Sequence, residues 1–204
     1  MSKYIGITMR QERCQTYNEI RDEIDITFYD FLAKCGYVPI LIPNNCIILD
    51  SYLRSIDFCG FILSGGGLPY PYSNEMTERD YVEKRIMNFA KEHELTVLGI
   101  CRGMQAIVIN HGAELIKVDN HVATVHQIKT VNRMEFKKNS FHRYALKEKN
   151  ENISILATAN DNVIEAVHIK NTSLYGIMWH PERNEEFDIE DINLIRRIFK
   201  EEDC

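Results

Sequence analysis

The residue with the clearest chemical potential is Cys101, which lies in the pattern Gly99-Ile-Cys101-Arg-Gly103. The apolar residues 95–100 before it predict a buried strand, and residues 102–111 have the spacing of a helix. Small residues on either side of a nucleophile permit the sharp, strained turn of a nucleophile elbow, which projects the side chain at the carboxyl end of a strand. The dipole of the following helix favours a thiolate. We therefore expect a cysteine nucleophile, with the backbone N–H of Arg102 pointing to where an oxyanion forms; the alternative is a buried structural cysteine.

A base for this thiol is offered by the segment Trp179-His180-Pro181-Glu182, which lies at the end of an expected strand over residues 174–179. In an extended segment, residues two apart place their side chains on the same side. Glu182 could then hold the imidazole of His180 in its useful tautomer, and His180 could take the thiol proton. A lone histidine is more often structural, but the elbow cysteine makes the catalytic interpretation the stronger one.

A glycine run, Ser64-Gly65-Gly66-Gly67, follows the third expected strand. Glycines let backbone N–H groups approach a substrate closely, and Gly66 is the candidate for the second oxyanion donor beside Arg102. By itself such a run is more often only a loop. With the other two motifs it completes the set that acyl transfer needs: nucleophile, base, orienting carboxylate and two oxyanion donors. The acyl-enzyme would be a thioester that water hydrolyses.

The elements that must position these residues alternate between short apolar runs and longer amphipathic segments, which predicts a parallel sheet covered on both faces. The capping signals are Thr77 before a helix and Gly36 after one. The alternation of strands and helices ends after residue 115. From there the expected strands follow one another without long helices between them, with a turn at Asp161-Asn162. The expected strands cover residues 4–8, 38–42, 59–63, 95–100, 122–131, 153–158, 163–169 and 174–179, and the expected helices cover 19–35, 46–55, 77–93, 102–111 and 188–200. No linker interrupts the chain, so we expect one domain over residues 1–204.

The amino-acid composition argues against several classes of function and location. The 204 residues are 45% hydrophobic and 26% charged, with 24 basic and 30 acidic residues and a net charge of −6, so we expect no nucleic-acid partner. The first residues lack the apolar core of a signal peptide, and no apolar stretch is long enough for a membrane span, so we expect no membrane contact and a cytoplasmic location. The six cysteines are scattered, as in a reducing compartment, and lack metal-ligand spacing.

A metal enzyme is the first rival hypothesis. Seven histidines are present, but no histidine–cysteine pair has zinc spacing. His121 and His126 are five residues apart, which predicts that they point to opposite faces of a strand. We therefore expect neither a metal nor a cofactor.

At this point the sequence resembles the class I glutamine amidotransferases, and within them the γ-glutamyl hydrolase branch (peptidase family C26). The matching segments occur in the family's order and are Ile5–Thr8, Ser64–Gly67, Gly99–Gln105, Asn139–His142, Ile164–Ala166 and Trp179–Glu182. The resemblance implies the α/β class, with a flavodoxin-like three-layer α/β/α sandwich and a mostly parallel sheet that gains antiparallel strands in the C-terminal half. It also implies a Cys101, His180 and Glu182 triad and an oxyanion hole at Gly66 and Arg102.

Substrate-binding residues follow from the same resemblance. Gln105, four residues after the nucleophile, would hold the amino-acid head of the glutamyl group, while Ser140 and His142 match a stretch near the substrate. The chain departs from the branch at Leu68 and Met178, which concerns the substrate rather than the chemistry. The expected activity is hydrolysis of a small-molecule γ-glutamyl amide.

The amine half of the substrate is open. Arg10, Arg13, Arg102 and Arg183 should all lie near the carboxyl edge of the sheet, and arginine matches phosphate bidentately. The segment Tyr70-Pro71-Tyr72 could stack on a base. These features favour a nucleotide-phosphate leaving group. The overall resemblance within the family then implies γ-glutamyl-CDP-amidate, in capsular phosphoramidate synthesis, as the best hypothesis. A solvated rim and a packed loop are the plainer interpretation, and γ-glutamyl-polyamine or γ-aminobutyrate conjugates are the near alternatives.

Three further classes stay open to comparison. The DJ-1-like group shares an elbow cysteine, but histidine usually follows it there, whereas Arg102 follows it here. A non-catalytic protein on the same scaffold usually lacks a triad member, and here all three are present. The serious alternative is a glutaminase that passes ammonia to a separate synthetase partner.

Overall fold

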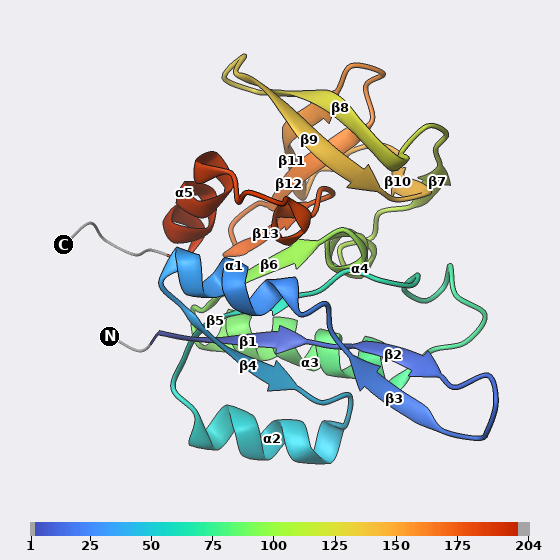
Figure 1. Cartoon of the computed structure of the whole chain (residues 1–204), viewed down its shortest axis with the longest axis vertical. Helices are drawn as coiled ribbons and strands as arrows, with labels where there is room; N and C mark the ends of the chain where they lie inside the picture. The colour runs from blue at the N-terminus through green and yellow to red at the C-terminus, as the bar shows by residue number, and fades with distance from the viewer. Residues whose placement is uncertain (1–2, 200–204) are drawn as a thin grey trace.

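The centre of the molecule is a sheet of nine strands in the order β4-β1-β5-β6-β13-β12-β11-β8-β9 (Figure 1). The computed structural model describes residues 3–199. The parallel strands of the sheet are β1 (Tyr4–Thr8), β4 (Val38–Ile42), β5 (Phe58–Leu63), β6 (Thr96–Ile100) and β13 (Leu174–Ile177). Numbered in chain order, these five run 2-1-3-4-5 across the sheet, which is the flavodoxin-like order. The expected α/β fold class is confirmed.

Helices cover both faces of the sheet, each over its own hydrophobic core. The helices are α1 (Thr27–Cys35), α2 (Cys46–Ser55), α3 (Glu78–Glu92), α4 (Arg102–Asn110) and α5 (Ile189–Ile198). Apolar residues of α2, α3 and α4 pack on one face, around Phe61 and Val97. Those of α1 and α5 pack on the other, around Ile62 and Leu98. Consecutive residues of β5 and β6 thus point to opposite layers, which makes the predicted three-layer sandwich.

The capping residues confirm two sequence signals. Thr77 begins α3 with a capping box, in which its hydroxyl accepts from the N–H of Asp80 and the Asp80 carboxylate accepts from the N–H of Thr77. Gly36 ends α1 in the left-handed conformation, with φ of 92°. Both signals can be found in the sequence because caps depend on local residue types.

The C-terminal half extends the sheet with antiparallel strands, as expected. They are β12 (Ile164–Ile169), β11 (Ile153–Ala159), β8 (Val122–Thr130) and β9 (Glu135–Phe141). A small two-stranded sheet, β7 (Leu115–Lys117) with β10 (Tyr144–Leu146), lies beside them. The sequence did not indicate β9, because two of its inward-facing residues, Lys138 and Ser140, are polar although both are buried.

The helix expected over residues 19–35 is wrong in its first part. Residues 20–23 form β3 (Ile20–Glu23), which pairs antiparallel with β2 (Arg10–Arg13), and α1 begins only at Thr27. Ile20 and Ile24 fall at helical spacing, but Ile20 is 53% exposed and adds nothing to a buried face. Asp25 marks the true start, since its carboxylate accepts from the N–H and the hydroxyl of Thr27.

Two broader expectations can be compared with residues 3–199. In that part of the chain, every helix is too short or too polar to cross a lipid bilayer. In the same part of the chain, the cysteines at 14, 35, 46, 59 and 101 form no disulfide, and Cys204 lies outside the described residues.

Candidate active site

Cys101 lies at the junction of β6 and α4 with φ of 52° and ψ of −104°. A positive φ is uncommon for a residue with a side chain, and such strain persists only where the surrounding structure enforces it. The flanking glycines allow the turn to close. A Cβ on Gly103 would lie 2.0 Å from the carbonyl oxygen of Leu63, and one on Gly99 would lie 2.3 Å from the backbone of Gly103. The Cys101 thiol is therefore held at the carboxyl end of β6 with only 7% of the residue exposed.

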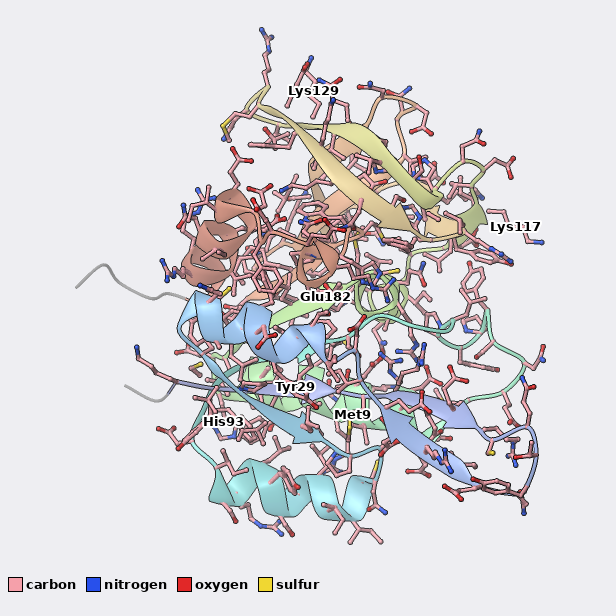
Figure 2. The ribbon with its side chains drawn as sticks, in the orientation of Figure 1. Met9, Tyr29, His93, Lys117, Lys129 and Glu182 are labelled. Atoms are coloured by element: carbon pink, nitrogen blue, oxygen red, sulfur yellow. The ribbon has the colours of Figure 1, made fainter. Side chains whose placement is uncertain are left out.

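His180 and Glu182 reach Cys101 from the neighbouring strand. β13 pairs parallel with β6, with Ile177 opposite Ile100, so the residues just after both strands meet at one edge. The His180 Nδ1 atom lies 2.6 Å from Glu182 Oε1, and the imidazole also hydrogen-bonds with the Cys101 thiol. Both His180 and Glu182 are buried, and Figure 2 shows Glu182 in the interior of the molecule. The structure thus brings together the three residues that the sequence predicted as a triad.

The electrostatics of this chain favour a charged imidazole. Burial disfavours the imidazolium, but the hydrogen bonds to Cys101 and Glu182 outweigh it and raise the pKa of His180 to about 9. His180 consequently carries a proton at neutral pH. Because that proton lies beside the thiol, it is available to a leaving group that forms next to Cys101.

The glycine loop lies directly against the imidazole. A Cβ on Gly65 would lie 2.6 Å from His180 Cε1, and Gly66 has φ of +93°, a conformation that L side chains rarely adopt. The loop follows β5, the strand beside β6, so the N–H of Gly66 and the N–H of Arg102 belong to adjacent strand ends. Those are the two predicted oxyanion donors.

A buried charge network, which the sequence did not indicate, fixes this loop. Arg79 donates to the carbonyl oxygens of Ser64, Gly65 and Gly66 at 2.6, 3.2 and 2.9 Å. Its Nε also donates to Glu83 at 2.8 Å, and burial lowers the Arg79 pKa to about 10, so the guanidinium stays charged at neutral pH. The helix α3 therefore holds the glycine loop by its carbonyl groups.

The Arg102 side chain belongs to the same network, which corrects one expectation. It is buried, and it donates to Glu83 and, at 2.7 Å, to Asp80. It is therefore not available to a phosphate at the rim, because its side chain is only 3% exposed and both of its carboxylate partners are less than a tenth exposed. Only its backbone N–H can serve the reaction.

A cavity of about 230 Å³ opens beside His180, and two of the predicted arginines line it. Arg10 packs its Cδ atom over Gly66 and forms ion pairs with Glu23 at 2.9 Å and Glu12 at 3.2 Å. Arg183 lies over the ring of Phe141, 4.9 Å from its centroid. The cavity lies beside the β1–β5 boundary, the switch point where flavodoxin-like sheets bind ligands.

Other expected leaving-group contacts lie elsewhere. Arg13 is exposed and donates to Asn18 at 3.0 Å, outside the cavity lining. The hydroxyl of Tyr72 accepts from the N–H of Leu115 at 2.7 Å, and Tyr70 lines a different hollow. The segment 70–72 is thus a packed loop rather than a base-stacking platform at this cavity.

Gln105 keeps one buried polar atom free for a ligand. Its Nε2 donates to the carbonyl oxygen of Tyr144 at 2.9 Å, whereas its Oε1, among the described residues, has no hydrogen-bond partner. A buried acceptor without a partner is costly, and a substrate ammonium group would satisfy it. This geometry suits the role that the family resemblance gave to Gln105.

Ser140 and His142 do not line the cavity. The hydroxyl of Ser140 donates to the carbonyl oxygen of His121 at 2.8 Å, and His142 faces Glu165 at 3.3 Å. Their neighbour Asn139, also on β9, contacts the site directly. Its side chain accepts from the N–H of His180 and donates to the His180 carbonyl oxygen, both at 2.8 Å. Asn139 therefore fixes the backbone of the candidate base.

His121 and His126 do not point apart as expected. Their ring centroids are 4.6 Å apart. Ala123, with φ of 52°, lies at an irregularity between Val122 and Thr124 in the pairing of β8 with β9. Such a bulge adds one residue and shifts every later side chain to the other face, so five residues bring the rings together.

Comparison with known proteins gives independent information on the relatives of this chain. A sequence model of the family described as Glutamine amidotransferase class-I matches residues 22–196. A γ-glutamyl-CDP-amidate hydrolase from Campylobacter jejuni is 31% identical over 96% of this chain and 97% of its own. A γ-glutamyl-γ-aminobutyrate hydrolase from Escherichia coli is 23% identical over 88% and 85%. In fold, a putative GMP synthase component from Thermoplasma acidophilum aligns with a TM-score of 0.69 at 18% identity, over 96% of this chain and 92% of that one.

Proposed function

The chain belongs to the class I glutamine amidotransferase family, and on that premise we propose that it cleaves a γ-glutamyl amide bond with Cys101, His180 and Glu182. The observation that carries the proposal is the continuous contact from the Cys101 thiol through His180 to the Glu182 carboxylate, at an elbow beside a glycine loop. Nucleophile, base and orienting group are then in the order that covalent acyl transfer requires.

In the first step His180 holds the proton of the Cys101 thiol, and the sulfur attacks the γ-carbonyl carbon of the glutamyl group. The oxyanion that forms is stabilised by the N–H groups of Gly66 and Arg102, a contribution of about 3 kcal/mol for each donor in comparable sites. The carbon–nitrogen bond then breaks, and His180 gives its proton to the departing nitrogen. A thioester on Cys101 and a free amine or phosphoramidate result.

In the second step water hydrolyses the thioester. His180, now neutral, accepts a proton from the water, and the sulfur leaves as the carbon–sulfur bond breaks. Glutamate is released and the enzyme returns to its starting protonation state. Glu182 keeps the imidazole oriented and stabilises its charged form in both steps.

For the leaving group we propose the amide of a nucleoside diphosphate. The specific substrate would then be γ-glutamyl-CDP-amidate. The Campylobacter jejuni relative carries that name. Arg10 and Arg183 line the cavity beside His180, and arginine binds phosphate through two parallel hydrogen bonds. A place in capsular phosphoramidate synthesis belongs to the same proposal.

Glutamate release by the purified protein tests both the proposed γ-glutamyl hydrolysis and the proposed leaving group. The substrates to compare are γ-glutamyl-CDP-amidate, γ-glutamyl-γ-aminobutyrate and glutamine, with Cys101→Ala as the blank. Rapid turnover of the first, slow turnover of the others and none by the variant is the expected result. Preference for the aminobutyrate conjugate would support γ-glutamyl amide hydrolysis but overturn the proposal of a nucleotide substrate. Activity only on glutamine, or only after a synthetase is added, would replace the proposal with an ammonia-supplying glutaminase.

A further inference from the structure

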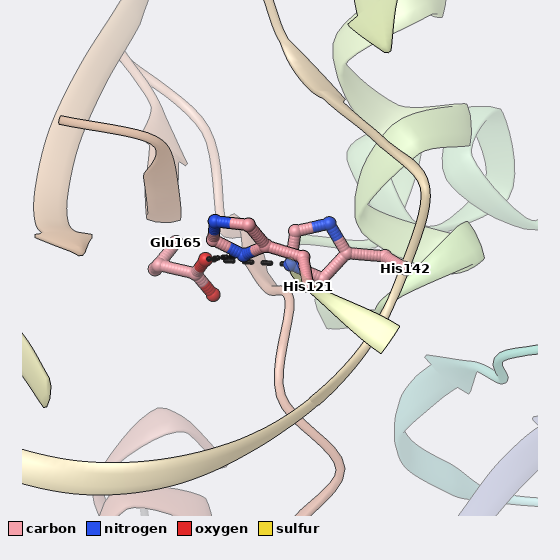
Figure 3. A group of neighbouring side chains, drawn as sticks. All are labelled: His121, His142 and Glu165. Atoms are coloured by element: carbon pink, nitrogen blue, oxygen red, sulfur yellow. Dashed lines mark ion pairs between the residues drawn. The ribbon is translucent and has the colours of Figure 1, made fainter. Parts of the chain in front are cut away.

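A second cluster of chemically active side chains lies away from the triad, between β8, β9 and β12. Three imidazoles face one oxygen of the buried Glu165. His121 Nδ1 and His142 Nε2 are each 3.3 Å from Glu165 Oε1, and His126 Nε2 is 3.5 Å from it. Figure 3 shows His121 and His142 directed at the Glu165 carboxylate from different parts of the chain. The mechanism uses none of these four residues.

Hydrogen bonding alone does not satisfy this arrangement. A carboxylate oxygen accepts well from about two donors, and here three ring nitrogens compete for it. Within residues 3–199, both oxygens of Glu165, both ring nitrogens of His142 and the Nε2 of His126 have no hydrogen bond of acceptable geometry. Buried polar atoms are nearly always paired, so the unpaired Nε2 atoms of His126 and His142 beside the unpaired Oε1 of Glu165 indicate a missing partner.

The distances from the Glu165 oxygen to the ring nitrogens are those of a metal coordination shell, and an ion would draw the two imidazoles of His121 and His142 closer together. Zinc binds imidazole nitrogen and carboxylate oxygen at about 2.0–2.2 Å, and tetrahedral angles then place neighbouring ligand atoms about 3.3–3.5 Å apart. The three nitrogen-to-oxygen distances of 3.3, 3.3 and 3.5 Å fall in that range. The ligand atoms of His121, His142 and Glu165 all lie within 4.8 Å of one another.

An outer carboxylate supports the same interpretation independently. The other ring nitrogen of His121, Nε2, lies 2.9 Å from Asp161 Oδ2. Histidines that bind metals usually donate their second ring N–H to a carboxylate or carbonyl, which fixes the tautomer and turns the free nitrogen toward the ion. His121 therefore presents Nδ1 to the cluster.

We propose that His121, His142 and Glu165 bind a first-row divalent cation of the zinc class, with water as the fourth ligand and His126 beside the site. Imidazole donors favour zinc, iron, cobalt, nickel or copper over magnesium or calcium, and zinc is the expected ion for a four-coordinate site. The ion cross-links β8, β9 and β12. Because β9 also carries Asn139, which holds the backbone of His180, the ion stabilises the strand that fixes the candidate base.

The test uses tag-free, full-length protein in a Cys101→Ala background, because the Cys101 thiol beside His180 is itself a zinc ligand. The protein is stripped with a chelator and titrated with Zn²⁺, and bound metal is measured by mass spectrometry. Co²⁺ is added separately, since imidazole ligation in a tetrahedral site gives visible absorption. We expect one equivalent per chain, and a rise in Tm of about 5–10 °C at a hundredfold excess over Kd.

Variants locate the site. His142→Gln and Glu165→Gln are expected to lose measurable binding. Asp161→Asn, at a residue that is 54% exposed in its side chain, should fold normally and weaken binding by about 10–100-fold. His93→Gln is the matched control, because it removes an exposed histidine outside the cluster.

The proposal is overturned if the Cys101→Ala protein binds no stoichiometric metal, or if wild-type protein binds it and Cys101→Ala does not. It is equally overturned if folded His142→Gln and Glu165→Gln proteins, checked by circular dichroism, bind as tightly as the control. Should those two variants fail to fold, the Asp161→Asn affinity decides between the outcomes.

Discussion

At Cys101 the backbone conformation and the side chain together place a nucleophilic sulfur beside a protonated imidazole. The positive φ of 52° is held by packing around two glycines, and it places the sulfur beside an imidazole that already carries a proton. The hydrogen bond from His180 to Glu182 keeps that proton in place against the cost of burial. The pair is therefore prepared for acyl transfer before a substrate binds.

The rate should depend on this proton. With the His180 pKa raised to about 9, the group is charged at neutral pH and loses its proton as the pH rises through about 9. We expect single-turnover glutamate formation to decline above pH 9. Glu182→Gln removes the charge that supports the imidazolium, so the decline should begin at lower pH and kcat should fall by about 10²–10⁴. An unchanged pH profile in this variant, measured by rapid quench, would mean that Glu182 does not set the protonation of His180.

Leaving-group selectivity is expected at Arg10. Its methylene groups pack over Gly66 at the cavity, and its side chain, which is 44% exposed, can pair with a phosphate, whereas glutamine offers no phosphate. Arg10→Ala should raise KM for γ-glutamyl-CDP-amidate by about tenfold or more and leave that for glutamine within about twofold. Arg13→Ala is the matched control, since Arg13 lies outside the cavity lining. Equal effects of the two variants on the two substrates would remove the nucleotide argument.

Among single residues, those with strong local signals were predictable. Cys101, His180 and Glu182 stand in short motifs whose spacing is itself chemical information. The arginines were harder because their partners are distant in the sequence: Arg102 is separated by 19 residues from Glu83, and that ion pair decides where its side chain lies. Asn139 lies in a segment that the family resemblance singled out, but its role was not predictable, because the backbone that it holds, at His180, lies 41 residues away.

At the scale of elements, the helix α3 acts as the support of the glycine loop. Three carbonyl groups of the loop accept from Arg79, whose charge is balanced by Glu83. Carbonyls held in this way orient the peptide units of the loop, and with them the N–H that faces the oxyanion. The loop is thus made rigid by an ion pair rather than by its own sequence.

Removing the Arg79 side chain tests this support. Arg79→Met leaves Glu83 buried with less compensation, and breaking a buried ion pair costs about 3–5 kcal/mol. We expect that loss of unfolding free energy in urea, together with a lower kcat from a misplaced oxyanion donor. Arg85→Met, on the same helix, removes only an exposed pair with Asp50 and should cost less than about 1 kcal/mol. Similar losses in both variants would contradict the buried role of Arg79.

Elements were predicted where hydrophobic pattern and packing coincide. The five parallel strands and the helices α2 to α5 follow from apolar runs and caps that face the two cores. The sequence pattern predicts a helix where β3 lies, because β2 and β3 pair only with each other and bury little, so no buried alternation marks the strand. The bulge at Ala123 was beyond prediction, because it arises from pairing with β9 rather than from the residues of β8.

For the whole molecule, the same proton links the active site to stability. A group whose pKa is higher in the folded state stabilises that state fully below its unfolded pKa, near 6.5, and the contribution is lost as the pH rises through the folded pKa of about 9. The free energy of unfolding of the wild type should therefore decline relative to that of His180→Gln between pH 6.5 and 9. Urea titrations at several pH values measure this difference. A constant difference over that window would show that His180 has an ordinary pKa in the folded protein.

The place of β13 in the sheet has a consequence for the order in which the enzyme is made. This strand lies between β6 and β12, yet it is the last strand of the chain, so a nascent polypeptide on the ribosome has β6 as an open edge until residues 174–177 are synthesised. His180 and Glu182 follow immediately behind. The reactive thiol therefore gains its proton partner at the same moment that the sheet closes, and a prematurely terminated chain leaves translation without a working base.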